Sequence, residues 1–388
     1  GVAGAATALA GSTTTAAVER QSSGSSSSGS WQDSLPSTGY PGSGSGGSDG
    51  SSGSSGLGSQ GGFGQFPQFG QGGGLSGGSG NAQGATADST SDATDEQSTG
   101  IVEITSTVSG GTAAGTGMIL TSSGLIVTNH HVVEGATSVK VTVVSTGKTY
   151  TATYVGGDAT ADVAVLRLQD ASGLETVDLS DDAAAVGDEI TSVGDANGDG
   201  GSLTASPGTV SALDQDITVQ DESGGGSSQL TDLMELDAYI VPGDSGGAVL
   251  DSDGEVVGMN VAASSGGSTV IGYAIPIATV ESVVDEILDG STSGDITLGY
   301  PGYLGIGLST TSTEATVAEV ADGEAAEKAG IVVGDTITSF NGTAVASADQ
   351  LHDLVAQTEP GEQAKVTWTT SSGATKSATV TLGTGPIA

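Results

Sequence analysis

The sequence contains no cysteine, which excludes a disulfide framework and any reaction that depends on a thiol. Aromatic residues make up only 3% of the chain. No stretch reaches the ~18 uninterrupted apolar residues that a membrane-spanning helix needs. Histidine is also scarce, so only three residues are candidates for a proton-accepting imidazole: His130, His131 and His352.

Basic residues are equally scarce. Seven Lys and Arg stand against 46 Asp and Glu, which gives a formal net charge of −39. Seven of these acids lie in residues 1–100, which leaves 39 for the rest of the chain. Such a surface repels the phosphate backbone of nucleic acids and an anionic membrane face, so neither is expected as a partner. Because salt screens like-charge repulsion, we hypothesise a protein adapted to high salt; a soluble secreted protein without that adaptation is the alternative.

Residues 1–98 are predicted to form no packed domain. The opening run Gly1–Gly11 is small and apolar, like the end of a signal segment or membrane anchor, but it is too short to span a bilayer alone. Ser/Gly-rich tracts follow, and a disordered linker is expected because these residues bury too little apolar surface to offset the entropy of ordering. The alternative is an interaction patch at Phe63, Phe66 and Phe69.

Residues 99–290 have the pattern of an all-β domain. Short β-branched runs, such as those that start at Ile101 and Leu125, recur ~10 residues apart between Gly, Ser, Asp and Asn, which is typical of a sandwich or barrel. Near Pro276 the apolar spacing becomes that of a helix, and Gly290 is its expected C-terminal cap. A short polar link then leads out of this domain.

Residues 299–388 indicate a second, smaller α+β domain. Strand-like runs are separated by turns at Asn341-Gly342 and Gly373. A helix is expected from about Ser347 to Ala356, and Ser347 with Gln350 has the spacing of a capping box.

The segment Pro242–Gly247 (PGDSGG) gives the strongest chemical indication. Peptide hydrolysis by serine needs an attacking hydroxyl, an imidazole that takes its proton, a carboxylate that orients the imidazole, and N–H groups that hold the oxyanion. The flanking glycines would let the N–H groups of Gly243 and Ser245 converge beside the Ser245 oxygen. An ordinary Gly/Asp/Ser turn is the alternative.

Two apolar segments supply the other groups. In LIVTNHHVV an apolar strand runs into His130 and His131, and on the chymotrypsin-like pattern His131 is the base. A metal site at the two histidines is the alternative, but no third His or Cys lies nearby, and no metal is expected. Asp162 opens a strand that looks buried, so its carboxylate needs a partner, for which His131 is the natural choice. Asp158 is expected to be a solvent-exposed turn residue.

The order His131, Asp162, Ser245 is that of chymotrypsin-like enzymes. Together with GTG at Gly115–Gly117 and GYAIP at Gly272–Pro276, these segments resemble the HtrA/DegP-type serine proteases of the Gly/Ser-linked actinobacterial kind over about residues 100–388. The resemblance implies a mainly β fold, in which a chymotrypsin-like double β-barrel is followed by an α+β PDZ domain.

The resemblance also implies a function. The protein would be an endopeptidase that needs no cofactor and degrades unfolded or damaged extracytoplasmic proteins. It would be anchored to the membrane or secreted, and members of this family are frequently homo-trimers. The PDZ domain would bind a peptide ligand, with Tyr303, Leu304, Gly305 and Ile306 in its carboxylate-binding loop. No Arg or Lys precedes this loop, a departure that weakens the case for binding a terminal carboxylate and leaves hydrophobic binding, against Ile306, Leu308 and Leu351. For Leu351 the alternative is a helix residue that faces the core of its own domain.

Two further segments have competing interpretations. Tyr239 lies six residues before Ser245, where such folds set the base of the substrate pocket, and predicts a preference for small or medium apolar residues. DANGDG at Asp195–Gly200 matches the first half of a calcium-binding loop, but Ser206 stands where a bidentate Glu is needed, so a polar loop is favoured.

Two other functions remain open from the residues. One is a chaperone or adaptor that holds unfolded chains and seldom cuts them, against which the complete set of triad residues argues. The other is an esterase with the same triad, which the PDZ-like unit disfavours.

Overall fold

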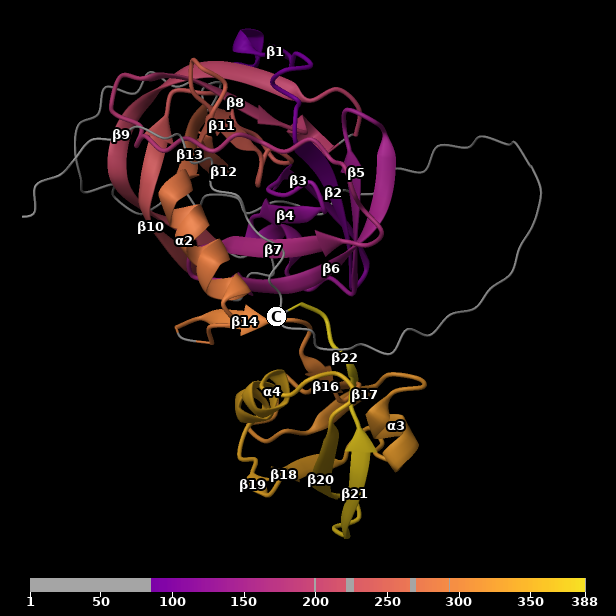
Figure 1. Cartoon of the computed structure of the whole chain (residues 1–388). Coiled ribbons are helices and arrows are strands. Elements are labelled where there is room, and N and C mark those ends of the chain that lie inside the picture. Colours follow the sequence, from indigo (N-terminus) through magenta and orange to yellow (C-terminus); the bar gives the residue numbers. More distant parts are fainter. Residues whose placement is uncertain (1–84, 199, 221–226, 266–269, 293, 388) are drawn as a thin grey trace, which may run out of the picture.

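The computed structural model describes residues 85–387 apart from 199, 221–226, 266–269 and 293. The expectations for Gly1–Gly11 and for most of the Ser/Gly-rich segment, its Phe residues included, lie outside the described residues. Figure 1 shows a larger lobe that contains β2–β13 and α2, and a smaller lobe that contains α3, α4 and β16–β21. Between them lies the end of the chain, next to β14.

The first barrel is a closed antiparallel sheet. Its strands are ordered β6-β5-β2-β3-β4-β7, and a further pairing between β6 and β7 closes the ring. The strands are β2 (Ile101–Val108), β3 (Gly111–Ile119), β4 (Leu125–Thr128), β5 (Ser138–Val143), β6 (Lys148–Asp158) and β7 (Val163–Leu168).

The second barrel repeats this arrangement. Its order is β9-β10-β13-β12-β11-β8, and pairing of β8 with β9 closes it. The strands are β8 (Glu189–Gly194), β9 (Thr204–Gln220), β10 (Ser227–Leu236), β11 (Ala248–Leu250), β12 (Val256–Ser265) and β13 (Val270–Pro276), and the short β1 (Ser91–Asp92) pairs with β9 at the edge. The 3-10 turns η1 (Ala87–Ser89) and η2 (Ala196–Gly198) lie in the loops.

Strands that face both barrels explain the unbroken apolar runs in the sequence. Along β4, Leu125 and Val127 point into the core shared by the two barrels, whereas Ile126 points into the first barrel. Since side chains alternate along a strand, β4 is apolar at consecutive positions because both of its faces are buried. These strands lead directly to the residues of the candidate site.

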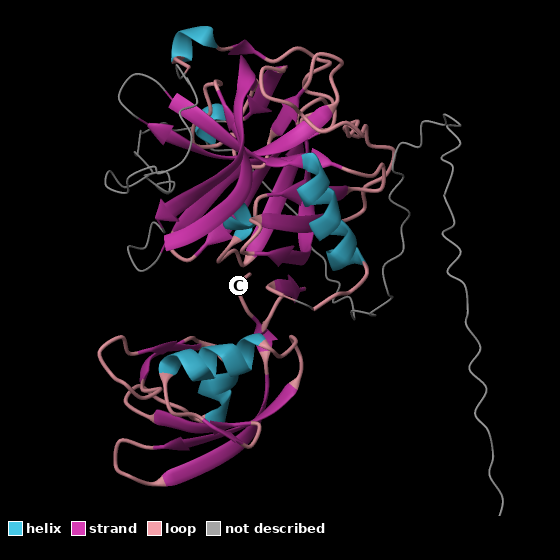
Figure 2. Ribbon diagram, turned by 90° about the vertical axis from the view of Figure 1, so that its left-hand side faces the viewer, coloured by secondary structure: helices cyan, strands magenta, loops and turns pink. Residues whose placement is uncertain are grey.

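Helix α2 (Ile277–Leu288) covers the larger lobe, as Figures 1 and 2 show, and ends the barrel region. It starts directly after β13. Its buried residues recur at helical spacing and join the core that the barrels share: Ile277, Val280, Val283, Val284 and Ile287. Gly290 follows with φ +74°, a conformation that glycine adopts readily, so the expected helix end is confirmed.

The smaller lobe has its own core, centred on Phe340 and Trp368. Its elements are β15 (Gly302–Tyr303), β16 (Ile306–Leu308), β17 (Val317–Val320), α3 (Ala325–Ala329), β18 (Thr336–Phe340), β19 (Thr343–Ala344), α4 (Ala348–Ala356), β20 (Gln363–Thr369), β21 (Thr375–Thr381) and β22 (Gly383–Thr384). Ser347 caps α4, because its Oγ accepts the Gln350 N–H at 3.2 Å. The Gln350 amide oxygen accepts from the N–H of Ala346 at 2.9 Å, one residue earlier than in a standard capping box.

Two segments join the smaller lobe to the first barrel. Before the lobe, β14 (Ile296–Leu298) pairs with β6 at the barrel's edge. After it, the Gly135 N–H donates to the Ile387 carbonyl at 2.8 Å, and the Ile387 N–H donates to the Ala136 carbonyl at 3.0 Å. The Ile387 side chain is 1% exposed and belongs to the core of the first barrel. The smaller lobe is therefore attached at both of its ends.

Candidate active site and peptide groove

Asp162 is presented by a tight turn between β6 and β7. The Asp158 carboxylate accepts the N–H groups of Thr160 and Ala161 at 2.8 and 2.9 Å, which fixes this turn. Asp162 itself has φ +54°, a left-handed conformation that Asp tolerates better than most residues. Asp158 is half-buried and shapes the loop, so describing it as a solvent-exposed turn residue was incomplete.

His131 lies in the short helix α1 (His130–Val133), which follows β4 directly. Its backbone N–H donates to Asp162 Oδ1 at 2.9 Å, and its ring Nδ1 lies 2.8 Å from Asp162 Oδ2. An ionised carboxylate only accepts hydrogen bonds, so Nδ1 bears the proton and Nε2 bears the lone pair. The side chains of His131 and Asp162 are 24% and 7% exposed, so a nearly buried carboxylate orients a partly accessible imidazole.

Ser245 lies in the loop between β10 and β11 and is 6% exposed. Its carbonyl accepts the Thr116 N–H at 2.9 Å, and the Thr116 carbonyl accepts the Thr128 hydroxyl at 2.7 Å. These bonds connect the Ser245 loop to the strand that leads to His131. The Ser245 hydroxyl donates to the Val261 carbonyl at 3.2 Å.

The backbone around Ser245 requires glycine. Gly243 has φ +99°, and a side chain there would collide with the carbonyl oxygen of Asp195. The Gly243 carbonyl accepts the Thr116 hydroxyl at 2.7 Å, which fixes the orientation of the following peptide. Within the described residues, neither the Gly243 N–H nor the Ser245 N–H donates a hydrogen bond to another group.

Asp244 is a feature of this loop that the sequence analysis did not single out. The side chain is 3% exposed, and its Oδ2 accepts the Val241 N–H at 2.9 Å. Its Oδ1 is buried without a hydrogen-bond partner among the described residues. Burial, together with a smaller contribution from the nearby Asp195 carboxyl, raises the pKa of Asp244 to about 7. Its place inside the GDSGG run, between residues that must be buried, was the available indication.

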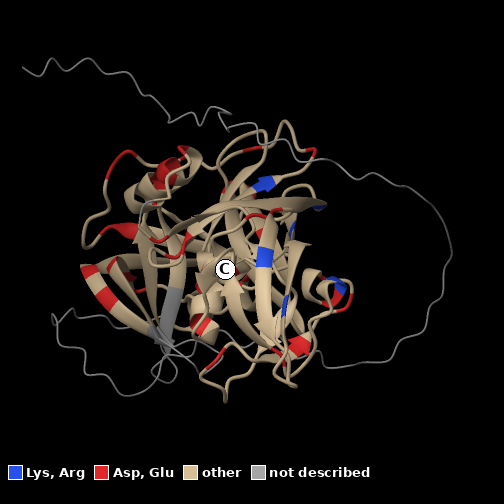
Figure 3. Cartoon of the chain, turned by 90° about the horizontal axis from the view of Figure 1, so that it is seen from below, with Lys and Arg blue, Asp and Glu red and all other residues tan. Residues whose placement is uncertain are grey.

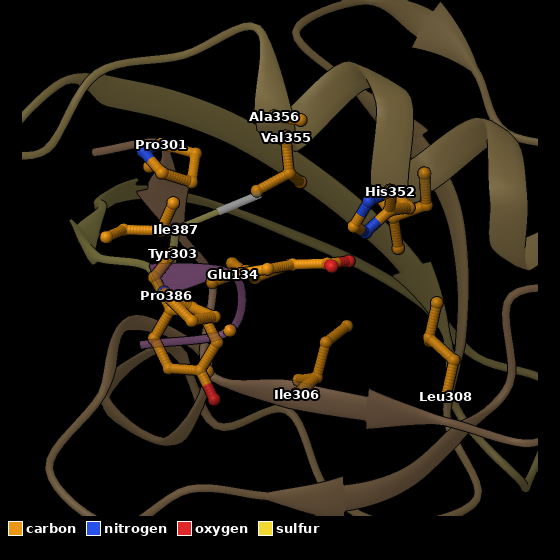
Figure 4. Close-up of a pocket in the computed structure, with 15 residues that line it drawn as sticks. Glu134, Pro301, Tyr303, Ile306, Leu308, His352, Val355, Ala356, Pro386 and Ile387 are labelled. Carbon is orange, nitrogen blue, oxygen red and sulfur yellow. The ribbon is translucent and has the colours of Figure 1, made fainter. Parts of the chain in front are cut away.

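The predicted loop Tyr303–Ile306 borders a groove between the smaller lobe and the first barrel, and Figure 4 shows the side chains around it. Gly305 has φ +80° and turns the loop. The groove has a volume of about 370 Å³, within the range of ligand sites. Ile306, Leu308 and Leu351 all line it, although Leu351, 2% exposed, is also part of the lobe's core. The sequence analysis did not find its other wall, which consists of Glu134, Gly135, Pro386 and Ile387.

Comparison with known proteins agrees with this architecture. Residues 115–259 match the trypsin-like peptidase domain, and residues 302–382 match the PDZ domain. The periplasmic pH-dependent serine endoprotease DegQ of Escherichia coli is 35% identical over 265 residues, 65% of this chain and 55% of that protein. The serine protease PepD of Mycobacterium tuberculosis is 33% identical over 291 residues, 69% of this chain and 60% of that protein.

The chain belongs to the HtrA/DegP family. It spans little more than half the length of the curated relatives it matches. Among solved structures, the serine endoprotease from Yersinia pestis is 27% identical, with a TM-score of 0.42 over 75% of this chain and 98% of that one.

Within this HtrA/DegP framework, three other residues from the sequence analysis take definite places. Tyr239 is half-buried, and its N–H donates to the hydroxyl of the buried Ser206 at 2.7 Å. Ser206 itself belongs to strand β9, so it is not part of a calcium-binding loop. His130 is 3% exposed, and its Nε2 is buried without a hydrogen-bond partner among the described residues.

Neither a metal cluster nor a membrane span is found in the described part of the chain. No group of three or more His, Cys, Asp or Glu residues there could hold a metal ion. No helix in the same residues has the length and apolar character to cross a bilayer. Residues Asp195–Gly198 pack instead against the Gly243 loop, since the Asn197 N–H donates to the Pro242 carbonyl at 2.6 Å.

Proposed function

We propose that the chain is a serine endopeptidase in which Ser245 is the nucleophile, His131 the general base and acid, and Asp162 the group that orients His131. The observation that supports this most directly is the 2.8 Å hydrogen bond between His131 Nδ1 and Asp162 Oδ2. It keeps the proton on Nδ1, which leaves Nε2 as the base and stabilises the imidazolium once it forms.

The first step begins with a rotation of the Ser245 hydroxyl. It moves from the Val261 carbonyl, to which it donates in the structure, toward Nε2 of His131. Nε2 takes the proton while Oγ attacks the scissile carbonyl, and the carbonyl π electrons move to its oxygen. The resulting oxyanion is stabilised by the N–H groups of Gly243 and Ser245, a type of interaction worth about 10²–10³ in rate per donor.

The second half returns the proton. The His131 imidazolium gives it to the leaving amine, the C–N bond breaks, and an acyl group remains on Ser245. A water then attacks this acyl group, Nε2 accepts its proton, and Ser245 recovers its own proton as the carboxylic acid product leaves. No external cofactor is needed for this balance.

Substrate, location and assembly are further parts of the proposal. The names of the relatives support an extracytoplasmic location and polypeptide substrates, and we propose unfolded or damaged proteins. We propose a protease domain at 99–290 and a PDZ domain at 299–388, which binds a peptide through the groove at Tyr303–Ile306. The preference for small or medium apolar residues from Tyr239 and the homo-trimeric state remain predictions.

The test is cleavage of unfolded casein by the wild type and by Ser245→Ala, at low and at molar KCl. Loss of about 10³-fold or more in rate on substitution is expected. Equal cleavage by both proteins would refute Ser245 as nucleophile. If neither protein cuts but both suppress client aggregation, the holding function replaces the endopeptidase.

A further inference from the structure

The groove beside Tyr303–Ile306 is shared between the two lobes. One wall comes from the PDZ domain, through β15, β16 and α4. The other comes from Glu134 and Gly135 at the end of α1 and from the segment Pro386–Ile387. A ligand in this groove would therefore contact the protease domain as well as the PDZ domain.

The protease-side wall is held in place by several bonds. The Glu134 N–H donates to the His130 carbonyl at 2.9 Å, which ends α1. Gly135 and Ala136 exchange backbone hydrogen bonds with Ile387 at 2.8 and 3.0 Å. Because the Ile387 side chain is buried in the first barrel together with Val132 and Val133, the wall and α1 share one core.

The charge of the groove is acidic. Among its 15 lining residues, Glu134 is the only carboxylate, and there is no Lys or Arg. In Figure 4 the Glu134 side chain extends into the groove, with its carboxylate between His352 on one side and Ile306 and Leu308 on the other. Burial raises the pKa of the Tyr303 hydroxyl, and the carboxylates of Glu324 and Glu319 raise it further, so negative charge also lies next to the loop.

The apolar residues and this charge select the same kind of ligand. Ile306, Leu308 and Val355, which are only partly buried, provide surface for aliphatic side chains. A terminal carboxylate would meet Glu134 in the groove and Glu324 beside Gly305, with no Lys or Arg among the lining residues to balance it. An ammonium or guanidinium group would pair with Glu134. Figure 3 shows that basic residues are few among the acidic residues of the chain. The cation that pairs with Glu134 would therefore be supplied by the ligand.

We propose that this groove binds an extended apolar peptide segment that has a Lys or Arg side chain, and that Glu134 of the protease domain selects for the cation. The proposal rests on the proposed peptide binding by the PDZ domain and adds the chemistry of its ligand. Binding would occur along the chain of the peptide and would not require its terminal carboxylate.

The experiment uses the whole chain with Ser245→Ala, so that peptides are not cut, and fluorescence anisotropy at low salt. Four labelled peptides share one aliphatic sequence: three have both ends blocked and contain Lys, Ala or Glu at one position, and the fourth is the Ala peptide with a free carboxyl end. We expect the Lys peptide to bind about fivefold to tenfold tighter than the Glu peptide, as partly exposed charge pairs allow. The free carboxyl end should give no gain over the blocked Ala peptide.

Glu134→Gln should reduce the Lys-to-Glu ratio to within about twofold of unity and leave the Ala peptide almost unchanged. Glu314→Gln, an exposed glutamate of the PDZ domain that does not line the groove, is the matched control and should keep the full ratio. Tighter binding of the Glu peptide or of the free carboxyl end, or a ratio that survives Glu134→Gln, would overturn the proposal. If no peptide binds while casein is still cut by the wild type, peptide binding fails but the endopeptidase stands.

Discussion

Replacing Asp244 with asparagine is expected to make the folded protein more stable above neutral pH, although it alters the residue next to the proposed nucleophile. The asparagine oxygen can still accept the Val241 N–H, as Asp244 Oδ2 does at 2.9 Å. The change removes a carboxyl group that is buried, lacks a second hydrogen-bond partner among the described residues, and lies near Asp195. It therefore removes the cost of ionising that group inside the protein.

The magnitude follows from the two pKa values of Asp244. In the unfolded chain the carboxyl releases its proton near 3.8, and in the folded protein burial raises the pKa to about 7. Between these values the folded state binds more protons, so this group's contribution to stability is complete below the lower pKa and is lost as the pH rises through the window. Each pKa unit between the two states corresponds to about 1.4 kcal/mol, so the free energy of unfolding loses about 4 kcal/mol in all. About 3 kcal/mol of this loss falls between about pH 4.5 and 8.5.

Calorimetric melting of the wild type and Asp244→Asn across this pH range would measure the effect. The other carboxyl groups titrate in both proteins, so the difference between their Tm values isolates Asp244. We expect the variant to gain about 10 °C over the wild type between the two ends of the range. Asp253→Asn, at an exposed turn, is the control and should show no such trend. Parallel curves for Asp244→Asn and the wild type would refute a protonated, buried Asp244.

Three other changes test separate parts of the structure. Gly243→Ala should reduce kcat on casein by about 10²-fold or more, because a side chain there collides with the Asp195 carbonyl and moves the proposed oxyanion donor; unchanged kcat would contradict the proposed role. Ile387→Ala should lower the free energy of unfolding of the first barrel by about 2–4 kcal/mol and Ile387→Val by about 1 kcal/mol in urea melts, whereas equal melts for all three proteins would mean that the side chain is not buried there. Raising KCl from low to molar concentration should raise the Tm of the wild type, because salt screens the repulsion among acidic residues that give a net charge of −39. A Tm that does not change with KCl would end the hypothesis of salt adaptation.

The barrels and the residues of the candidate triad were accessible from the sequence because each depends on local pattern. The β-branched runs predicted strands, and His131, Asp162 and Ser245 each follow a motif with its own backbone requirement. The pairing of β6 with β7, which closes the first barrel, could not be predicted from the sequence. The residues of β7 are apolar on both faces, and this pattern does not say which strand lies beside it. Pattern reveals burial but not which neighbour provides it.

The surroundings of the site were harder to predict because they depend on contacts between distant segments. Asp244 is buried because Gly194 approaches it so closely that no side chain would fit there. The sequence predicts an exposed Asp158, because it does not show that the Asp158 carboxylate accepts the N–H groups of the turn before Asp162. Nothing in the short run around Ile387 indicated that it would enter the core of the first barrel, whose last strand ends more than 200 residues earlier in the chain.

The two attachments of the smaller lobe also limit how it can move. One is β14 on the edge of β6, and the other is Ile387 beside Gly135 and Ala136, so both lie on the first barrel. With these two attachments fixed, the least restricted motion of the lobe would be a rotation about the line that joins them. Such a rotation would change the width of the groove against Glu134 while leaving the second barrel, with Ser245, stationary. The position of the lobe is thus set by the first barrel, which contains His131 and Asp162.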